Sequence, residues 1–456
     1  MALVRRLDGE IQPGWKWGPF TTRLPGVHFK LSLADTIQGG LIIAGVSGGL
    51  VPIYMKYFGV PFEIAWGLLI IHMFWVGIVP TWFLGEPYSP GWITPVLPIV
   101  LLHFAGFKPG IECVHYMMAC MIWLSVLMLF FGFTGLGRKF FTWVPDGIKA
   151  GIILGGGIAA FQSEIVKLPT APFSFGAGWL VCFLLIFSLP IIKLRHQKVM
   201  RQLLSWGFLL GYVAAGIAGY LSGELKWGPI PWNKFIFPDF PAIWAALSPW
   251  GVGFPSAAMF MKAFPLALIA YVIGFGDMIV ASSLVQQAAQ KRPDEKVVID
   301  HTRTHFSVAI RNLGQLFTGG VFPAFVGVTY SGAHAFLCEK YAAGRKIVDS
   351  IYDAVASFNW FYLFLAMWLP VIMIMKPILP AALSLTLILT GFACAFVGIS
   401  MLQNTGNQSK AIAIFMAVVI AKYGAAWGLA SGIICYLLMV WRPKIEIDWY
   451  NLGGKK

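Results

Sequence analysis

The sequence predicts an all-α polytopic membrane protein, with about fourteen transmembrane segments in two inverted repeats of seven and two broken half-helix spans. Three observations predict this fold: an apolar composition, an internal repeat, and two clusters of helix-breaking residues inside apolar regions. Of the 456 residues, 58% are hydrophobic and only 11% are charged, whereas about a quarter of the residues in a soluble domain are charged. Roughly twelve to fourteen apolar runs approach the ~20 residues needed to cross a bilayer, so twelve complete spans stay open as an alternative.

The basic residues lie in short connections and not in one patch. The formal net charge is +14, but this spread argues against a nucleic-acid partner. With fourteen spans, the basic connections and both termini fall on one side of the membrane. Since Lys and Arg mark cytoplasmic loops, we expect a protein of the plasma (bacterial inner) membrane with both termini in the cytoplasm. The basic positions are Arg138, Lys139, Lys193, Arg195, Lys198, Arg201, Lys291, Arg292, Lys296, Lys340, Arg345, Lys346, Arg442 and Lys444.

Two stretches of the first half recur in the second half. "PDGIKAGIILGGGIAAF" from Pro145 matches "PAALSLTLILTGFACAF" from Pro380 at six of seventeen positions, an offset of 380 − 145 = 235 residues. "GEPYS" at 85–89 matches "GVTYS" at 327–331 with an offset of 242 residues. Because seven spans per half is an odd number, the second copy is expected to be inverted in the membrane. The expected organisation is a cytoplasmic N-terminal segment (1–30), a first repeat (31–225), an extracytoplasmic linker (226–260), a second repeat (261–441) and a cytoplasmic tail (442–456).

The two clusters of helix breakers predict the substrate site. "EPYSPGWITP" and "VGVTYSGAHAF" should each form an extended segment that leads into a half-helix, because non-helical backbone at membrane depth is tolerated only inside protein or beside a water-filled cavity. Two half-helix N-termini would then face each other near the midplane, where their dipoles favour an anion or a polar solute. The substrate-binding candidates are Tyr88, Ser89, Trp92, Thr94, Gly276, Tyr330, Ser331, Gly332 and His334, with His334 as the expected repeat partner of Trp92.

One long stretch of the second half reads "IGFGDMIVASSLVQQ … DHTRTHFSVAIRNLGQLFTGGVFPAFVGVTYSGAHAF". This stretch resembles the nucleobase–ascorbate transporters and the sulfate permease (SulP) branch of the same superfamily. The likeness implies a core domain (spans 1–4 and 8–11), a gate domain (spans 5–7 and 12–14), an elevator-like cycle and a homodimer. Nucleobase carriers of this family have acidic or amide side chains at two positions where this chain has Ile273 and Gly332. These departures argue against a purine or pyrimidine substrate.

Three charged residues within the spans are candidates for coupling or gating. Asp277 lies in an apolar run, where an unpaired charge costs about 2.5–3.5 kcal/mol; the alternative is an aspartate at a helix end in the headgroup zone. Glu86 precedes the first broken span and alternatively caps its half-helix. Arg311 lies in the ninth span and alternatively extends its charged end to the membrane surface.

The expected function is secondary active transport of a small polar or anionic organic solute, with a proton or Na⁺ as the coupling ion and no other cofactor. The alternatives are an uncoupled anion exchanger or channel of the sulfate permease type, and a nucleobase (xanthine or uracil) permease with an altered site. An enzyme is not expected, because the sequence has no P-loop or HExxH motif and its polar residues concentrate in the two broken spans. The six cysteines lie in apolar stretches without a CxxC pair, so no metal site is expected. The expected partners are the substrate, the lipid bilayer and a second copy of the chain.

Overall fold

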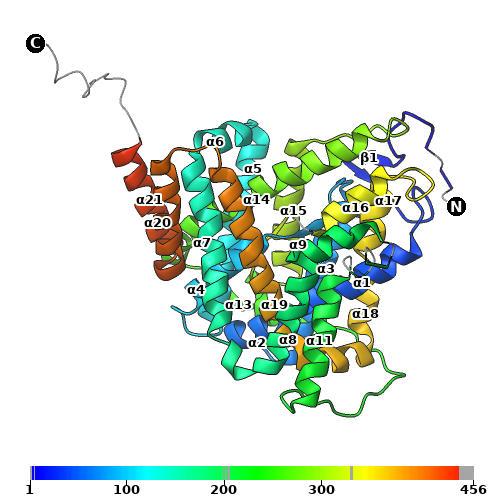
Figure 1. Ribbon diagram of the computed structural model, residues 1–456, viewed down its shortest axis with the longest axis horizontal. Coiled ribbons are helices and arrows are strands. Elements are labelled where there is room, and N and C mark those ends of the chain that lie inside the picture. The colour runs from blue at the N-terminus through cyan, green and yellow to red at the C-terminus, as the bar shows by residue number, and fades with distance from the viewer. Residues whose placement is uncertain are drawn as a thin grey trace, which may run out of the picture.

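The computed structural model describes residues 3–4, 6–197, 199–200, 203, 206–328 and 332–440. The predicted tail 442–456 lies outside this part of the chain. The described residues form a helical protein (Figure 1), as predicted, with four strands of three residues each as an addition. Strands β1 (Trp15–Trp17) and β2 (Phe20–Thr22) pair as an antiparallel hairpin inside the N-terminal segment.

The first half of the chain alternates long helices with short irregular pieces. After the hairpin, its helices and its third strand are α1 (Leu33–Gly48), α2 (Val51–Phe58), α3 (Phe62–Met73), the π-helix η1 (Phe74–Phe83), β3 (Pro90–Trp92), the 3-10 turn η2 (Thr94–Val96), α4 (Leu97–Phe104), α5 (Ile111–Thr134), α6 (Gly137–Trp143), α7 (Asp146–Ile165), η3 (Leu168–Thr170), α8 (Pro172–Cys182), the π-helix η4 (Phe183–Phe187), α9 (Leu189–Ile192), η5 (Lys193–His196) and α11 (Gly207–Leu221).

The second half contains the two longest helices. Its elements are α12 (Phe240–Leu247), α13 (Pro249–Val252), α14 (Ala257–Gln290), α15 (His301–Thr318), β4 (Val326–Val328), α16 (Gly332–Ala342), α17 (Ile351–Phe358), α18 (Tyr362–Met367), α19 (Leu369–Leu402), α20 (Asn407–Tyr423) and α21 (Ala425–Met439). Polar side chains cap several of these helices: for example, Ser256 accepts a hydrogen bond from the backbone N–H of Met259 at the start of α14, and Asp300 accepts from Thr302 and Arg303 at the start of α15. Such caps satisfy N–H groups that have no partner inside the helix.

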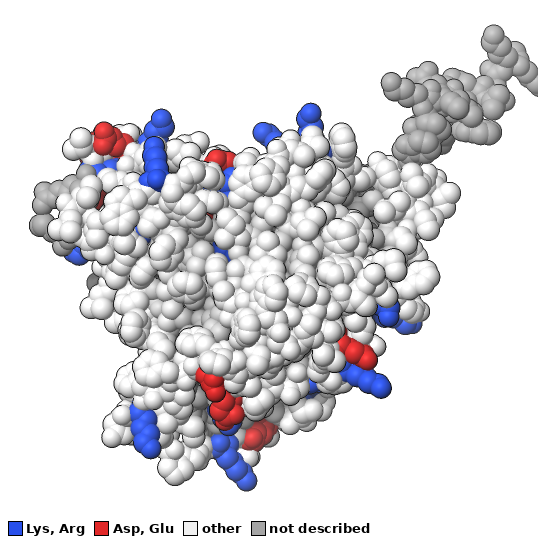
Figure 2. All heavy atoms as spheres, turned by 180° about the vertical axis from the view of Figure 1, so that it is seen from behind, with Lys and Arg blue, Asp and Glu red and all other residues white. Residues whose placement is uncertain are grey.

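Six helical segments in the described part of the chain are long and apolar enough to cross a membrane: Asp35–Phe58, Phe62–Phe83, Ile111–Thr134, Asp146–Thr170, Ala257–Gln290 and Leu369–Leu402. Five more are apolar but shorter, and α4 belongs to them. Together with α15, α16 and α20 these make fourteen candidate segments, while the fourteen-span inverted repeat stays a prediction. Figure 2 shows that charged side chains gather toward two opposite ends of one face and that the broad region between them is nearly uncharged. This distribution is typical of a membrane protein.

The helices form two groups. In one group α7 packs against α19 and α20, α20 packs against α21, and α8 packs against α11 and α19; in the other, α5 packs against α14 and α15, and α16 packs against α14 and α17. Figure 1 shows α20 and α21 at the left beside α7, with α5 and α14 next to them, and α16 and α17 at the right. We call these the α7 group and the α5 group. Helix α19 of the first group also packs against α1 and η2.

Both helix-breaking clusters form the extended segments that the sequence predicts. β3 and β4 pair antiparallel, with Pro90 opposite Val328, Gly91 opposite Gly327 and Trp92 opposite Val326. The central pair of glycines gives an offset of 327 − 91 = 236 residues between the halves, which agrees with the Pro145/Pro380 match. The "GEPYS"/"GVTYS" alignment, with its offset of 242, is therefore wrong, and His334 is not the repeat partner of Trp92. The match failed because two short motifs share Gly, Tyr and Ser on opposite sides of the strands: 85–89 precedes β3, whereas 329–331 follows β4.

Candidate functional site

The β3–β4 pair brings two half-helices together. The strand β3 leads into η2 and α4, and β4 leads toward α16. Beyond the strands, the backbone N–H of Ile93 donates a 3.0 Å hydrogen bond to the carbonyl of Phe325. A glycine is needed at position 327 because the two segments approach closely: a Cβ on Gly327 would lie 2.7 Å from Cγ1 of Ile93. The N-terminal ends of α4 and α16 are thus fixed on either side of one crossing inside the protein.

Arg311 of α15 holds this crossing. Its side chain is 1% exposed, and its Nε donates to the carbonyl of Trp75 at 3.1 Å. Its Nη2 lies within hydrogen-bonding distance of the carbonyls of Val76, Gly91 and Gly327, at 3.2, 3.4 and 3.2 Å. The guanidinium therefore bridges η1 and both strands. The alternative that Arg311 extends its charged end to the membrane surface is therefore wrong. The contacts favour a structural clamp over a gating role.

Asn312 supports the second strand beside Arg311. Its side-chain amide donates to the carbonyl of Val326 at 2.9 Å and accepts from the N–H of the same residue at 3.0 Å. Phe325, the residue before β4, has φ = 59°, a left-handed conformation that bulky side chains rarely adopt. Strain of this kind persists only where the surroundings fix the backbone, and the Asn312 amide is one such constraint.

Four predicted site residues lie packed inside the α5 group. Tyr88, Ser89, Trp92 and His334 are each at most 5% exposed. Nδ1 of His334 accepts a 3.1 Å hydrogen bond from the N–H of Ser89, and its Nε2 lies 3.0 Å from the carbonyl of Ala281. An imidazole that accepts at Nδ1 and donates at Nε2 is neutral. His334 therefore ties the segment before β3 to α14, which favours a structural role.

Three other predicted residues are partly exposed: Thr94, Gly276 and Asp277. Thr94 opens η2, and a Cβ on Gly276 would meet only Phe141, at 3.8 Å. Asp277 interacts electrostatically with the thiol of Cys394, which lies on α19. Asp277 is thus placed at the boundary between the α5 group and the α7 group.

Glu86 is buried away from the half-helix that it was considered to cap. The hydroxyl of Thr304 donates to its Oε2 at 3.0 Å, and Nε of Arg303 lies 3.9 Å from its Oε1. The carboxylate therefore belongs to the start of α15, and the capping alternative is wrong. Tyr330 and Ser331 lie outside the described residues, and Gly332 is the first residue of α16.

The sequence reasoning missed the glycines of α7 that face this region. A Cβ on Gly156 would collide with the backbone oxygen of Pro95 in η2, and a Cβ on Gly157 would lie 2.9 Å from Cβ of Cys394 and 3.0 Å from the backbone oxygen of Gly391. Three consecutive glycines, Gly155 to Gly157, in an apolar run were the available signal, because small residues allow close helix packing in membranes. They let α7 approach both the broken span and α19 beside Asp277.

No protein-family model matches the chain. A benzoate membrane transport protein from Acinetobacter baylyi (strain ATCC 33305 / BD413 / ADP1) is 22% identical over 449 residues, which cover 93% of this chain and 99% of the relative. The transmembrane domain of a cyanobacterial bicarbonate transporter, BicA, superposes with a TM-score of 0.51 at 14% identity, over 88% of this chain and 97% of that one. Murine Solute Carrier 26 family member A9, an anion transporter in the inward-facing state, superposes with a TM-score of 0.52 at 13% identity, over 90% of this chain and 68% of that one.

The chain has the fold of these transporters. The resemblance to the sulfate permease branch that the sequence predicted is confirmed at the level of the fold. Each of these relatives is named as a transporter and none as an enzyme, which agrees with the prediction that the chain is not an enzyme.

Proposed function

We propose that the chain is a secondary active transporter that moves a small organic carboxylate across the plasma membrane. The observation that carries this proposal is the β3–β4 crossing, which brings the N-terminal ends of two half-helices to one place. Each such end carries about half a positive charge and free backbone N–H groups. A carboxylate suits this environment, since helix N-termini bind anions through both effects.

The substrate class follows from the chemistry around the crossing and from the relatives. Thr94 is partly exposed, with its hydroxyl 3.3 Å from the carbonyl of Trp92, and Trp92, Ile93 and Phe322 are apolar neighbours of the crossing. An apolar body with one carboxylate matches these groups. The relative named as a benzoate transporter makes benzoate the first compound to test. Ile273 and Gly332 favour this class over a nucleobase.

We assign coupling to Asp277, with a proton or Na⁺ as the ion. The α5 group corresponds to the expected core domain and the α7 group to the gate domain, so Asp277 lies where the two would slide in an elevator-like cycle. A carboxylate at this boundary can bind a cation on one side of the membrane and release it on the other. The proposed arrangement is a homodimer with cytoplasmic termini.

The test is uptake of labelled benzoate into liposomes that contain the purified protein. An inward proton gradient or an inward Na⁺ gradient is imposed in separate experiments, and bicarbonate, sulfate and uracil are added as competitors. Asp277→Asn should lose gradient-driven accumulation and keep benzoate exchange, because the amide keeps its shape but cannot change charge. Asp239→Asn, an exposed aspartate that caps α12, is the control.

Two results would contradict the proposal. Accumulation by Asp277→Asn at the wild-type level would remove Asp277 from coupling. Benzoate exchange that neither gradient drives would instead support the alternative of an uncoupled anion exchanger. Thr94→Leu tests the site itself, since a larger apolar side chain there should block benzoate binding while Thr94→Ser keeps it.

A further inference from the structure

A group of buried polar side chains lies beneath the N-terminal segment. Several buried side chains in the described part of the chain have a polar atom without a hydrogen-bond partner, and five of them, each at most 7% exposed, are neighbours here. These atoms are Nη1 of Arg23, Oε1 of Glu86, the hydroxyl of Tyr88, Nε of Arg303 and Oδ1 of Asp353. They come from four places in the chain: the N-terminal segment, the segment before β3, the start of α15, and α17. We call this group the polar chamber.

Contacts between these residues place them in one neighbourhood. Nε of Arg303 lies 3.9 Å from Oε1 of Glu86. Nη1 of Arg23 would lie 2.8 Å from a Cβ on Gly85, the residue before Glu86. The guanidinium of Arg23 lies 3.9 Å from the ring centre of Tyr352, which precedes Asp353. Arg23 also interacts electrostatically with Arg303 and Asp353, and Tyr88 with Glu86 and Arg303.

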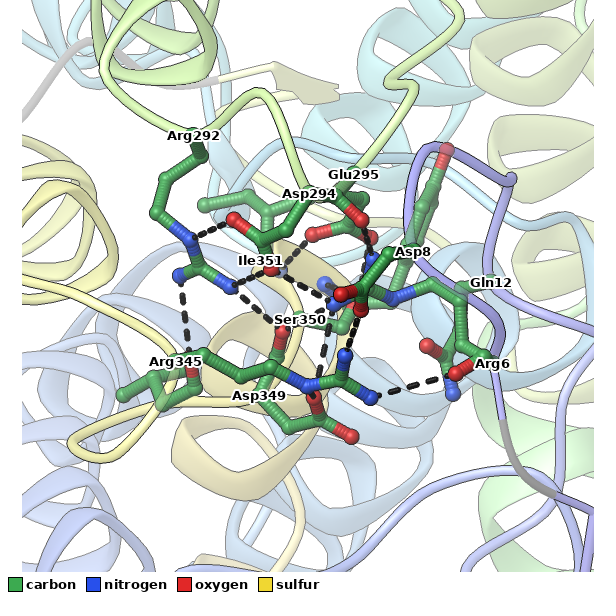
Figure 3. A network of polar contacts seen from close by, with 12 residues as sticks. Arg6, Asp8, Gln12, Arg292, Asp294, Glu295, Arg345, Asp349, Ser350 and Ile351 are labelled. Atoms are coloured by element: carbon green, nitrogen blue, oxygen red, sulfur yellow. Dashed lines mark hydrogen bonds and ion pairs between the residues drawn. The ribbon is translucent and has the colours of Figure 1, made fainter.

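Side-chain contacts link the polar chamber to residues at the protein surface. The carboxylate of Glu295 interacts electrostatically with Arg23 and accepts a 2.6 Å hydrogen bond from the hydroxyl of Ser350. Ser350 lies in the network of Figure 3, where arginines join the N-terminal segment to the loops that follow α14 and α16. The carboxylates of Asp294 and Asp349 in this network are 22% and 43% exposed. They lie on the side that the basic loops mark as cytoplasmic.

Five buried polar atoms without hydrogen bonds are not a stable arrangement in a dry interior. Each such atom carries a desolvation penalty, which the 3.9 Å ion pair between Nε of Arg303 and Oε1 of Glu86 offsets only in part. Water removes this penalty, because buried waters bind where two to four polar groups converge. The charges nearly balance as well, with Arg23 and Arg303 beside Glu86, Glu295 and Asp353.

We propose that the polar chamber binds water and that Glu86 exchanges the coupling proton with the cytoplasm through it. The inference rests on the proposed proton-coupled transport. Thr304 donates to Oε2 of Glu86, while Oε1 has no hydrogen bond and lies 3.9 Å from Nε of Arg303. In the protonated state the carboxylic acid breaks its O–H bond and gives the proton to a bound water, which becomes hydronium. The hydronium passes its proton through the water to the cytoplasm, and Arg303 stabilises the carboxylate that remains.

The groups that face Glu86 determine when this transfer happens. Arg303, Arg311 and Asp300 of α15 act on its charge, and Thr304 donates a hydrogen bond. The two arginines favour the carboxylate, whereas burial favours the neutral acid. The N-terminal segment supplies Arg23 and covers the chamber. A change of conformation that moves α15 relative to the segment before β3 would alter this balance and load or release the proton.

The first experiment needs no transport. Infrared difference spectra of the whole protein in lipid, recorded as the pH is changed, detect the carbonyl stretch of protonated carboxylic acids. One titrating carboxylic-acid band should be missing in Glu86→Gln and kept in Glu63→Gln, an exposed glutamate at the start of α3. An unchanged set of bands in Glu86→Gln would overturn the proposal, whether or not benzoate is the substrate.

The second experiment uses benzoate and a proton gradient in liposomes. Glu86→Gln should lose proton-driven accumulation at least about tenfold and keep benzoate exchange. Asp353→Asn keeps Glu86 and removes one water-binding oxygen, so proton-driven uptake should slow and its pH profile should shift while exchange is unchanged. Wild-type accumulation and pH profiles in both variants would overturn the proposal. If the wild-type protein shows no benzoate exchange, the proposed function is contradicted. The infrared experiment alone then tests the polar chamber.

Discussion

Arg311→Met tests whether the β3–β4 crossing is held by a buried arginine or whether this arginine serves the substrate. The substitution keeps a long side chain but removes every donor. Nε and Nη2 of Arg311 together reach four backbone carbonyls. Because three of these share Nη2, we count two full hydrogen bonds of about 1.5–3 kcal/mol each for a charged donor. Two such bonds give about 3–6 kcal/mol, and we expect a loss of about 3–5 kcal/mol, the range for breaking a buried charged pair.

This loss converts into a measurable change in melting temperature. Unfolding entropy of about 2.1 cal/mol/K per residue gives roughly 1 kcal/mol/K for a chain of this length, so the melting temperature should fall by about 3–5 °C. The assay is thermal unfolding of the purified protein in detergent, beside benzoate binding. Arg311→Lys should be intermediate, because an ammonium keeps the charge but lacks the planar fork. Arg138→Lys, at an exposed arginine, is the control.

A specific result would refute the clamp. If Arg311→Met unfolds at the wild-type temperature and yet loses benzoate binding, the guanidinium serves the substrate and not the crossing. If both stability and binding fall, the crossing and the site are one structure, as the geometry implies.

Three further predictions follow from close contacts and exposed charges. Gly49→Ala should lower the melting temperature and slow transport, because its Cβ would lie 2.9 Å from the backbone nitrogen of Leu383 and 3.0 Å from its Cα, which would force α19 away from the end of α1. Asp294 hydrogen-bonds to Arg292 and ion-pairs with Arg6, which holds the pKa of its carboxyl well below the usual range; its stabilising effect is present above the unfolded pKa of about 3.9 and is lost as the pH falls below that value. Thermal melts from neutral to acid pH should therefore converge for wild type and Asp294→Asn. A cysteine at Pro293 should resist an impermeant thiol reagent added outside intact cells.

Each of these predictions has a matched comparison. Gly176→Ala adds the same methyl group where nothing lies within 4 Å, and an equal effect of both alanines would contradict the close approach. Melts of Asp294→Asn that match wild type already at neutral pH would show that the ion pair adds no stability. Labelling of the cysteine at Pro293 from outside would place the network of Figure 3 on the outer face and refute the expected topology.

The sequence by itself determined the membrane class, the helical fold and the position of the two broken spans. These features depend on composition and on local chemistry, because a chain poor in charge partitions into lipid and closely spaced prolines and glycines interrupt a helix. "EPYSPGWITP" therefore predicted an extended segment before a half-helix, and β3, η2 and α4 are that segment. The Pro145/Pro380 match also gave the spacing between the halves to within one residue.

Only the tertiary structure decided which polar residues meet. Arg311 and Glu86 each had two local explanations, and their partners lie more than 200 residues away at Gly91 and Thr304, beyond any local pattern. The "GEPYS"/"GVTYS" alignment failed for a related reason. Three shared residues specify the correspondence between the two halves less well than the pairing of β3 with β4. Whether a buried charge is a clamp, a cap or a proton site depends on which groups surround it, because in a low-dielectric interior its free energy is set by those neighbours.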